Sequence, residues 1–288
     1  PMTAPFRKIL FPVDFSDRAA AVAPAVYTLA QKHNADLTIL HALELPPGAY
    51  ADWYAFSAMV DVDALRAHQR SLLDNFAPGA PASVTVERVM LDGPPVPTIV
   101  NYATLNGFDL IALPTHGFGA FRSLLLGSIT AGVLHDTHVP VWTAAHAETL
   151  EEHREPHRIL CAIDLAPSSQ GVLEWAQKLA NFYQAELRVV HAIPQVYDPV
   201  QAFSADDFRH YLMQQARERY APVALATNVA APLTMVEGGV GHAIGDEAKS
   251  FNADLLVIGR GVIHHTFGRL RTHAYDLIRS SPCPVLSI

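Results

Sequence analysis

Short apolar runs alternate with longer amphipathic stretches along the first half of the chain. The runs Ile9–Val13, Leu110–Pro114 and Val139–Thr143 are almost continuously apolar, which is typical of parallel strands that are buried on both faces. Two further runs, Leu37–Leu43 and Val84–Leu91, also have the length of a strand. The pattern therefore predicts five strands in this half.

Stretches of helical length lie between the predicted strands. They are Arg18–His33, Asp61–Phe76, Val96–Asn106 and Ser128–His135. Ser16 is placed to cap the first of these helices, and Pro24 is placed to kink it or to delay its start. Strands that alternate with helices predict an α/β fold, here a doubly wound five-stranded parallel sheet with helices on both faces.

The second half of the chain repeats the first in the order, spacing and type of its residues, which indicates a duplication. The matching pairs are Arg7–Asp14 with Arg158–Asp164, Ala35–Ala42 with Ala185–Ala192, Asp109–Leu113 with Asp254–Ile258, and His138–Trp142 with Cys283–Ser287. We therefore expect two tandem domains, residues 1–146 and 158–288. The polar, acidic stretch 147–157 is the expected linker.

The composition excludes several classes of protein. The formal net charge is −8, from 28 acidic and 20 basic residues, and no cluster of Lys and Arg is long enough for the basic stripe of a nucleic-acid binder. No apolar run approaches the roughly 18 residues that a membrane-spanning helix needs. We also see no export signal. We therefore expect a cytoplasmic protein that binds neither nucleic acid nor membrane.

The residues at the ends of two strands point to a ligand site. In open parallel sheets, ligands bind beyond the carboxyl ends of the strands. The candidates are Pro12, Val13 and Asp14 after the first strand, Pro114, Thr115, His116 and Gly117 at the end of the fourth, and Gly127, Ser128, Ile129 and Thr130 at the start of the next helix. A glycine with neighbouring hydroxyls at a helix start favours phosphate, but the same residues also suit a simple helix cap. Both readings stay open at this point.

Two of these stretches, Thr115–Pro140 and RKILFPVDFS at the start of the chain, resemble the signature regions of the universal stress protein family. ATP-binding members carry G-x2-G-x9-G-[S/T] after the fourth strand. Gly117, Gly127 and Ser128 match the last three positions, whereas Pro114 stands at the first glycine. That departure concerns the ribose contact more than the phosphate cradle.

The resemblance implies two domains of the universal stress protein (HUP) type, packed as an internal pseudo-dimer through their last strands, with a homodimer as a further form. It also implies that the first half binds ATP, with or without Mg²⁺. Asp14 and the backbone near Pro12 would then meet the adenine, and Ala42 would line the base pocket. Residues around Gly117, Gly127 and Ser128 would hold the phosphates.

The second half departs further from the motif. Ten residues after Gly261, where the family has its third glycine, stands Arg271, followed by Thr272. An arginine side chain in place of this glycine predicts that the phosphate pocket is filled or blocked. We therefore expect the second half not to hold ATP.

Three functions remain after this comparison. The leading hypothesis is an ATP-binding regulatory protein of the stress response. The alternatives are a nucleotide-free interaction scaffold, in which Pro114 disables the first half as well, and a slow ATPase. The chain has neither a G-x-S-x-G elbow nor a G-x-x-x-x-G-K-[ST] loop, so we assign no catalytic residue.

Cysteine and histidine give no further site. With the family's strand order 3-2-1-4-5, Cys161 and Cys283 lie two strand spacings apart, too far for a disulfide, so we expect free thiols. The pairs His135 with His138 and His264 with His265 lack a further ligand at a zinc spacing. We expect no metal site.

Overall fold

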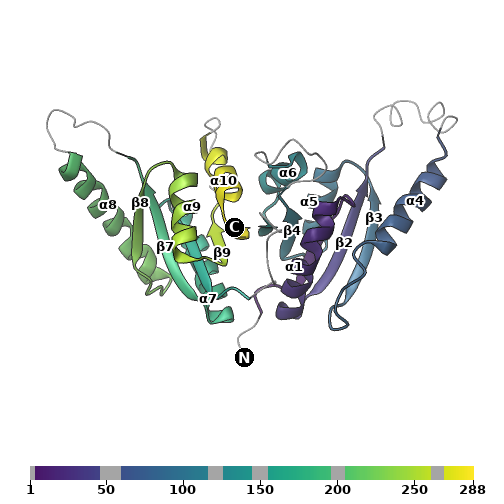
Figure 1. Ribbon diagram of the computed structural model, residues 1–288, viewed down its shortest axis with the longest axis horizontal. Helices are drawn as coiled ribbons and strands as arrows, with labels where there is room; N and C mark the ends of the chain where they lie inside the picture. The colour runs from purple at the N-terminus through teal and green to yellow at the C-terminus, as the bar shows by residue number, and fades with distance from the viewer. Residues whose placement is uncertain (1–3, 46–59, 116–125, 145–154, 196–204, 261–268) are drawn as a thin grey trace. The chain divides into compact units, whose positions relative to one another are not determined.

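The computed structural model describes residues 4–45, 60–115, 126–144, 155–195, 205–260 and 269–288. The chain forms two compact units, which consist mainly of Phe6–Trp142 and of Arg154–Ile288 (Figure 1). In the described residues, no helix has the length and apolar character that crossing a membrane requires.

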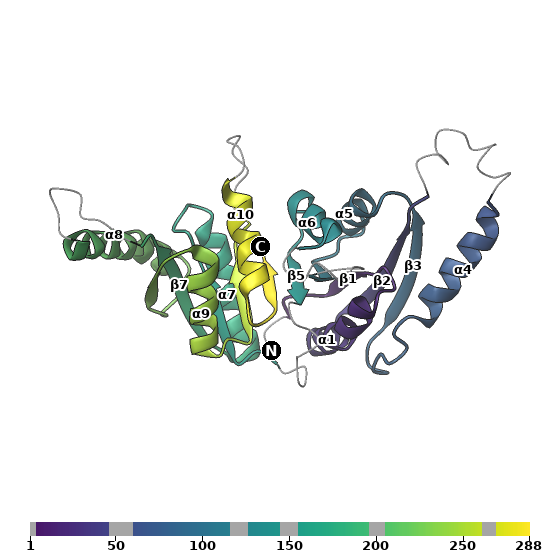
Figure 2. The ribbon, with the colours of Figure 1, turned by 45° about the horizontal axis from the view of Figure 1, so that its top comes forward.

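The first unit confirms the α/β prediction element by element. Its elements in chain order are β1 (Lys8–Pro12), α1 (Asp17–His33), β2 (Asp36–Leu43), α4 (Val62–Asn75), β3 (Val86–Asp92), α5 (Pro95–Leu105), β4 (Leu110–Pro114), α6 (Ser128–Asp136) and β5 (Val141–Ala144). The strand order is β3-β2-β1-β4-β5. In Figure 2, α5 and α6 lie on one side of this sheet and α1 lies on the other, as right-handed crossovers require when the strand order reverses at β1.

The second unit has the same topology. Its elements are β6 (Arg158–Ala162), α7 (Ser169–Tyr183), β7 (Glu186–Ile193), α8 (Ala205–Ala226), β8 (Leu233–Glu237), α9 (Val240–Phe251), β9 (Leu255–Ile258), α10 (Arg269–Ser280) and β10 (Val285–Ser287). The strands follow the order β8-β7-β6-β9-β10. Lys8 pairs with Asp36 in the first unit, and Arg158 pairs with Glu186 in the second, so the duplication extends to the strand register.

One aspartate in each unit holds the start of the first strand. The Asp109 carboxylate accepts hydrogen bonds from the N–H groups of Arg7 (2.8 Å) and Lys8 (3.1 Å). In the second unit, Asp254 accepts from the N–H groups at positions 157 and 158 at 2.9 and 2.8 Å. Charge-assisted bonds of this kind are stronger than neutral ones. The repeated aspartate therefore keeps the first and fourth strands aligned in both units.

Helix α1 begins where Ser16 predicts it. The Ser16 hydroxyl accepts a hydrogen bond from the N–H of Ala19 at 3.2 Å, and the helix continues through Pro24 to His33. The delayed start that Pro24 suggested is therefore wrong. A proline removes one backbone donor from the helix, whereas the Ser16 cap and a buried apolar face stabilise the first turn.

The central strands are buried on both faces, as their apolar runs predict. In β1, Ile9, Leu10 and Phe11 have no exposed side-chain surface, and in β4 the same holds for Leu110 and Ile111. A strand that touches no water on either face must sit between helical layers. The core of each unit therefore forms around its first and fourth strands, and the carboxyl ends of these strands become the floor of any ligand site.

Both cysteines are free and buried, which confirms the predicted free thiols. Cys161 lies in β6, Cys283 lies just before β10, and β9 runs between those strands. Burial raises the pKa of each thiol to about 12. Because the thiolate is the reactive form, both side chains are expected to be inert at neutral pH.

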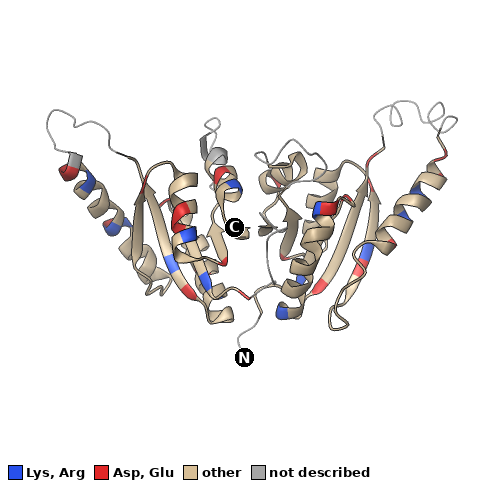
Figure 3. Cartoon of the chain, viewed as in Figure 1, with Lys and Arg blue, Asp and Glu red and all other residues tan. Residues whose placement is uncertain are grey.

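Charged side chains of both signs are interspersed along the described helices (Figure 3). Arg70 pairs with Asp74 on α4 at 3.0 Å, and Arg279 pairs with Asp276 on α10 at 3.1 Å. Exposed pairs of this kind contribute little to stability. Along the described helices the positive charges are thus offset locally and do not form a basic stripe.

Candidate functional site

The structure brings the predicted residues after β1 and β4 to one edge of the first unit. These strands are neighbours, with Ile9 opposite Leu110 and Leu10 opposite Ile111. Because the pair is parallel, the residues that follow β1 and β4 leave the sheet at the same edge. Pro12 also pairs with Leu40 of β2, so Ala42, two residues further on, lies at this edge and is half-buried. His116 and Gly117 lie outside the described residues.

The loop after β1 is held in one conformation by its own hydrogen bonds. One carboxylate oxygen of Asp14 accepts from both the N–H (3.1 Å) and the hydroxyl (2.6 Å) of Ser16. Between them, Phe15 adopts a left-handed backbone conformation with φ of 61°, which is uncommon for a bulky residue and needs support from its surroundings. Asp14 is half-exposed, and none of the hydrogen bonds described for it uses its second carboxylate oxygen.

His41 supplies that support, and sequence reasoning did not single it out as a site residue. Its Nδ1 lies 2.9 Å from the carbonyl oxygen of Val13, and its ring centroid lies 4.3 Å from that of Phe15. A carbonyl oxygen only accepts, so Nδ1 carries the proton. The signal was present in the repeat, because His191 makes the same 2.9 Å contact with the carbonyl of Ile163.

The start of α6 is tied to the end of β4. The N–H of Gly127 donates to the carbonyl of Thr115 at 3.0 Å, and the hydroxyl of the buried Thr130 donates to the carbonyl of Pro114 at 2.9 Å. Ser128 is exposed and Ile129 is half-buried. The hydroxyl proton of Thr130 is thus donated within the protein, whereas the hydroxyl group of Ser128 stays exposed to solvent.

Gly127 is the N-cap of α6. Its φ of −59° and ψ of 144° suit any residue, and the helix has no side-chain cap. Compared with glycine, aspartate, asparagine or serine at this N-cap would stabilise the helix by only about a few tenths of a kcal/mol. The first N–H groups of a helix have no partner inside it and favour negative charge. Gly127 leaves these groups open to an anion.

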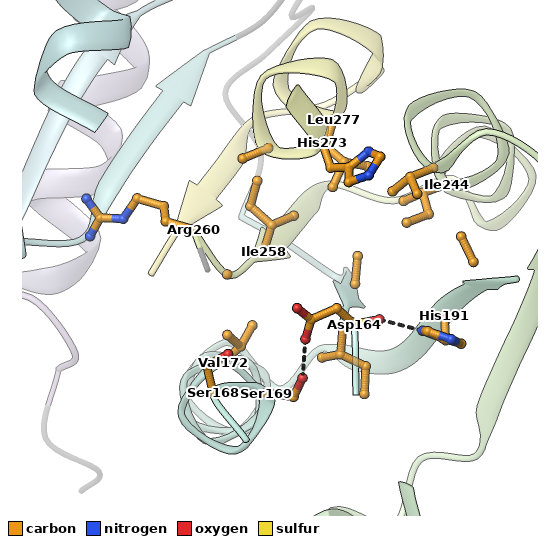
Figure 4. Close-up of a pocket in the computed structure, with 16 residues that line it drawn as sticks. Asp164, Ser168, Ser169, Val172, His191, Ile244, Ile258, Arg260, His273 and Leu277 are labelled. Carbon is orange, nitrogen blue, oxygen red and sulfur yellow. Dashed lines mark hydrogen bonds between the residues drawn. The ribbon is translucent and has the colours of Figure 1, made fainter. Parts of the chain in front are cut away.

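The second unit has a cavity of about 130 Å³ at the carboxyl ends of β6 and β9 (Figure 4). Asp164 follows β6, and one of its oxygens accepts hydrogen bonds from the N–H of Ala166 (3.0 Å) and the hydroxyl of Ser169 (2.8 Å). Arg260 follows β9, and burial lowers the pKa of its guanidinium to about 10. In both units, an aspartate after the first strand thus accepts hydrogen bonds from the loop that follows it.

The phosphate end of the second unit differs from that of the first. Helix α10 begins at Arg269, so Arg271 lies inside its first turn, whereas the aligned Gly127 precedes α6. The helix start is displaced relative to the motif. The Arg271 side chain is not among those described, so its blocking of the pocket stays a prediction.

A metal centre is not apparent in the parts of the chain that are described. No three His, Cys, Asp or Glu side chains there are grouped so that they could hold an ion. His135 contacts the carboxylate of Asp136, and His264 and His265 lie outside the described ranges.

Comparisons with known proteins agree with the duplicated fold. The universal stress protein family matches residues 5–144 and 156–288. A universal stress protein of Thermus aquaticus is 31% identical over 140 residues, which are 47% of this chain and 96% of that protein. One of Methanocaldococcus jannaschii is 26% identical over 140 residues, which are 47% of this chain and 80% of that protein.

Solved structures match the whole chain. A universal stress protein from Archaeoglobus fulgidus superposes with a TM-score of 0.62 and 22% identity, covering 97% of this chain and 95% of its own. A functionally unknown protein of Pseudomonas aeruginosa gives a TM-score of 0.61 and 16% identity, covering 99% of this chain and 93% of its own. Some members of the family bind nucleotides; one solved universal stress protein is in complex with cAMP.

Proposed function

Because the chain belongs to the universal stress protein family, we propose that its first half binds an adenine nucleotide, ATP with or without Mg²⁺, and that occupancy of this site regulates what the protein binds. The observation that carries the proposal is the junction of β4 and α6. There, Gly127 starts a helix without a side-chain cap, beside a strand end to which it is hydrogen-bonded.

The parts of the site suit the parts of a nucleotide. The open N–H groups at the start of α6 favour a phosphate, and the exposed Ser128 hydroxyl lies next to them. At the other end, Asp14 is held by Ser16 with its second oxygen free to accept from an exocyclic amine. Mg²⁺ would neutralise phosphate charge when bound. A divalent ion held mainly by phosphates needs few ligands from the protein.

The difference between the two halves supports a regulatory role. One half keeps the glycine and the uncapped helix start, while in the other the helix begins earlier and an arginine stands at the aligned position. A chain in which only one half can bind a nucleotide changes its state when a single nucleotide binds. The pairing of the halves through their last strands, a homodimer and a cytoplasmic location stay predictions of the same proposal.

We expect about one adenine nucleotide per chain in the purified protein. Mass spectrometry of the small molecules released on denaturation measures this, together with calorimetric titration of ATP into nucleotide-free protein. Two nucleotides per chain would contradict the asymmetry. No released nucleotide and no binding of added ATP would contradict the proposal and favour the nucleotide-free scaffold.

Replacing His41 with alanine should weaken nucleotide binding by about tenfold, because the 2.9 Å bond that holds the Val13 carbonyl and the stack against Phe15 are both lost. His41→Asn should restore most of the affinity, since the amide nitrogen of asparagine occupies nearly the position of Nδ1. The matched control is His191→Ala, which removes the same bond from the other half. Equal losses in the His41→Ala and His191→Ala variants would show that the effect is not local to the site.

A further inference from the structure

The cavity of the second half has apolar walls. Ile258 from β9, Ile244 from α9 and Leu277 from α10 line it, and all three side chains are buried (Figure 4). Val172 of α7 closes another side. Apolar walls with a few polar groups are the usual make-up of a small-molecule site. The walls are suited to hold the hydrocarbon part of a ligand.

The size of the cavity limits the ligand. Its volume of about 130 Å³ is close to the roughly 150 Å³ of an engineered apolar cavity that binds benzene. Sites for drug-sized ligands have roughly 300–1,000 Å³. The cavity therefore covers a ligand part of about one ring, and most of a nucleotide triphosphate would extend beyond it.

The polar groups of the cavity favour a hydrogen-bond donor with positive charge. The Asp164 carboxylate points into the cavity in Figure 4. Among the described residues, no Lys or Arg forms an ion pair with this carboxylate. One of its oxygens accepts from Ala166 and Ser169, and the other is available. Arg260, which also lines the cavity, extends away from Asp164 in the same view. An available carboxylate beside apolar walls suits an ammonium group.

Two imidazoles are the other titratable side chains among the described residues that line the cavity. His191 uses its Nδ1 proton on the carbonyl of Ile163 (2.9 Å). His273, from α10, lies across the cavity from Asp164 (Figure 4). A neutral imidazole accepts one hydrogen bond, so neither ring opposes an amine while it is uncharged.

We propose that this cavity binds a small amine of about one ring in size. Its ammonium group contacts the Asp164 carboxylate, and its apolar body lies against Ile244, Ile258 and Leu277. The ligand class differs from the nucleotide proposed for the first half, and the inference does not depend on that proposal.

Three probes of one shape test the ligand class. Benzylamine, benzyl alcohol and benzoate carry the same ring with a positive, neutral or negative group. Each is titrated into the full-length protein while NMR follows the labelled methyl groups of Ile244 and Ile258. We expect benzylamine to bind with a dissociation constant of about 1 mM, typical of a ligand with so few atoms. Benzyl alcohol should bind about three- to tenfold more weakly, because the carboxylate is exposed to water, and benzoate more weakly still.

Variants distinguish the contribution of the Asp164 carboxylate to binding from that of the apolar walls. Asp164→Asn keeps an oxygen for Ala166 and Ser169 but removes the charge, so benzylamine should lose its advantage over benzyl alcohol. The matched control is Asp14→Asn in the first half, which should leave benzylamine binding unchanged. Ala274→Leu fills the cavity from α10 and should abolish binding of all three probes.

Several results would overturn the proposal. One is the absence of methyl shifts with benzylamine up to about 20 mM, a concentration well above the expected dissociation constant. Another is benzoate binding as tightly as benzylamine. A third is an unchanged preference in Asp164→Asn while Ala274→Leu blocks binding. Displacement of benzylamine by ATP would also overturn it, since the cavity would then take nucleotides.

Discussion

Replacing Gly127 with aspartate should abolish adenine-nucleotide binding while leaving the first half as stable as before, or slightly more stable. The backbone at this position suits any residue, and aspartate is a preferred N-cap that stabilises a helix by about a few tenths of a kcal/mol compared with glycine. Its carboxylate would occupy the place of the phosphate, and like charges at close range cost several kcal/mol. We expect affinity for ATP to fall by about 100-fold or more, measured by calorimetry.

The matched control for this prediction is Gly127→Asn. Asparagine caps the helix equally well but carries no charge, so it should weaken binding clearly less than aspartate does. Thermal unfolding of both variants checks that the fold is intact. ATP binding with unchanged affinity in Gly127→Asp would contradict the assignment of phosphate to the start of α6, and with it the central part of the proposed function.

Replacing Phe11 with alanine should destabilise the first half by about 3–5 kcal/mol, the usual range for a buried Phe→Ala change. Phe11 lies in β1 with no exposed surface, and its ring centroid is 6.3 Å from that of Phe76 at the end of α4. Alanine would leave a cavity between β1 and this helix. Because the chain has two units, a single two-state transition cannot be assumed. Hydrogen-exchange mass spectrometry is therefore the measurement, since it reports on peptides from each half separately.

The repeat supplies the control for Phe11. Cys161 occupies the aligned position in β6 and is equally buried. Cys161→Ala removes one sulfur atom and should cost about 1–2 kcal/mol in the second half. A loss of protection in the Phe11→Ala variant no greater than that in Cys161→Ala would contradict the view that the Phe11–Phe76 contact anchors α4 to the sheet.

The site residues differ in how far the sequence could have predicted them. Asp14 and Gly127 stand at a strand end and a helix start, which apolar runs and glycine positions reveal. His41 stands inside a strand, where a histidine is more often a packing residue. Its hydrogen bond to Val13 became apparent only when β1 and β2 were placed side by side. That His191 makes the same bond shows that comparing the two halves for polar residues within strands would have found it.

The sequence by itself determined the strands, the helices and the duplication. These depend on short, almost continuously apolar runs such as those of β1 and β4, on the amphipathic stretches between the strands, and on matched segments such as Ala35–Ala42 and Ala185–Ala192. Local sequence is sufficient for them because strand and helix periods are local properties.

Only the tertiary structure decided how the polar atoms of the site are used. It directed the Thr130 hydroxyl to Pro114 instead of to a ligand, and it started α10 ahead of the position aligned with Gly127. It also formed a cavity around Asp164 from six separate elements of the second half. Such contacts join residues that lie far apart in the chain. They follow from strand register and helix packing, which no local pattern of residues specifies.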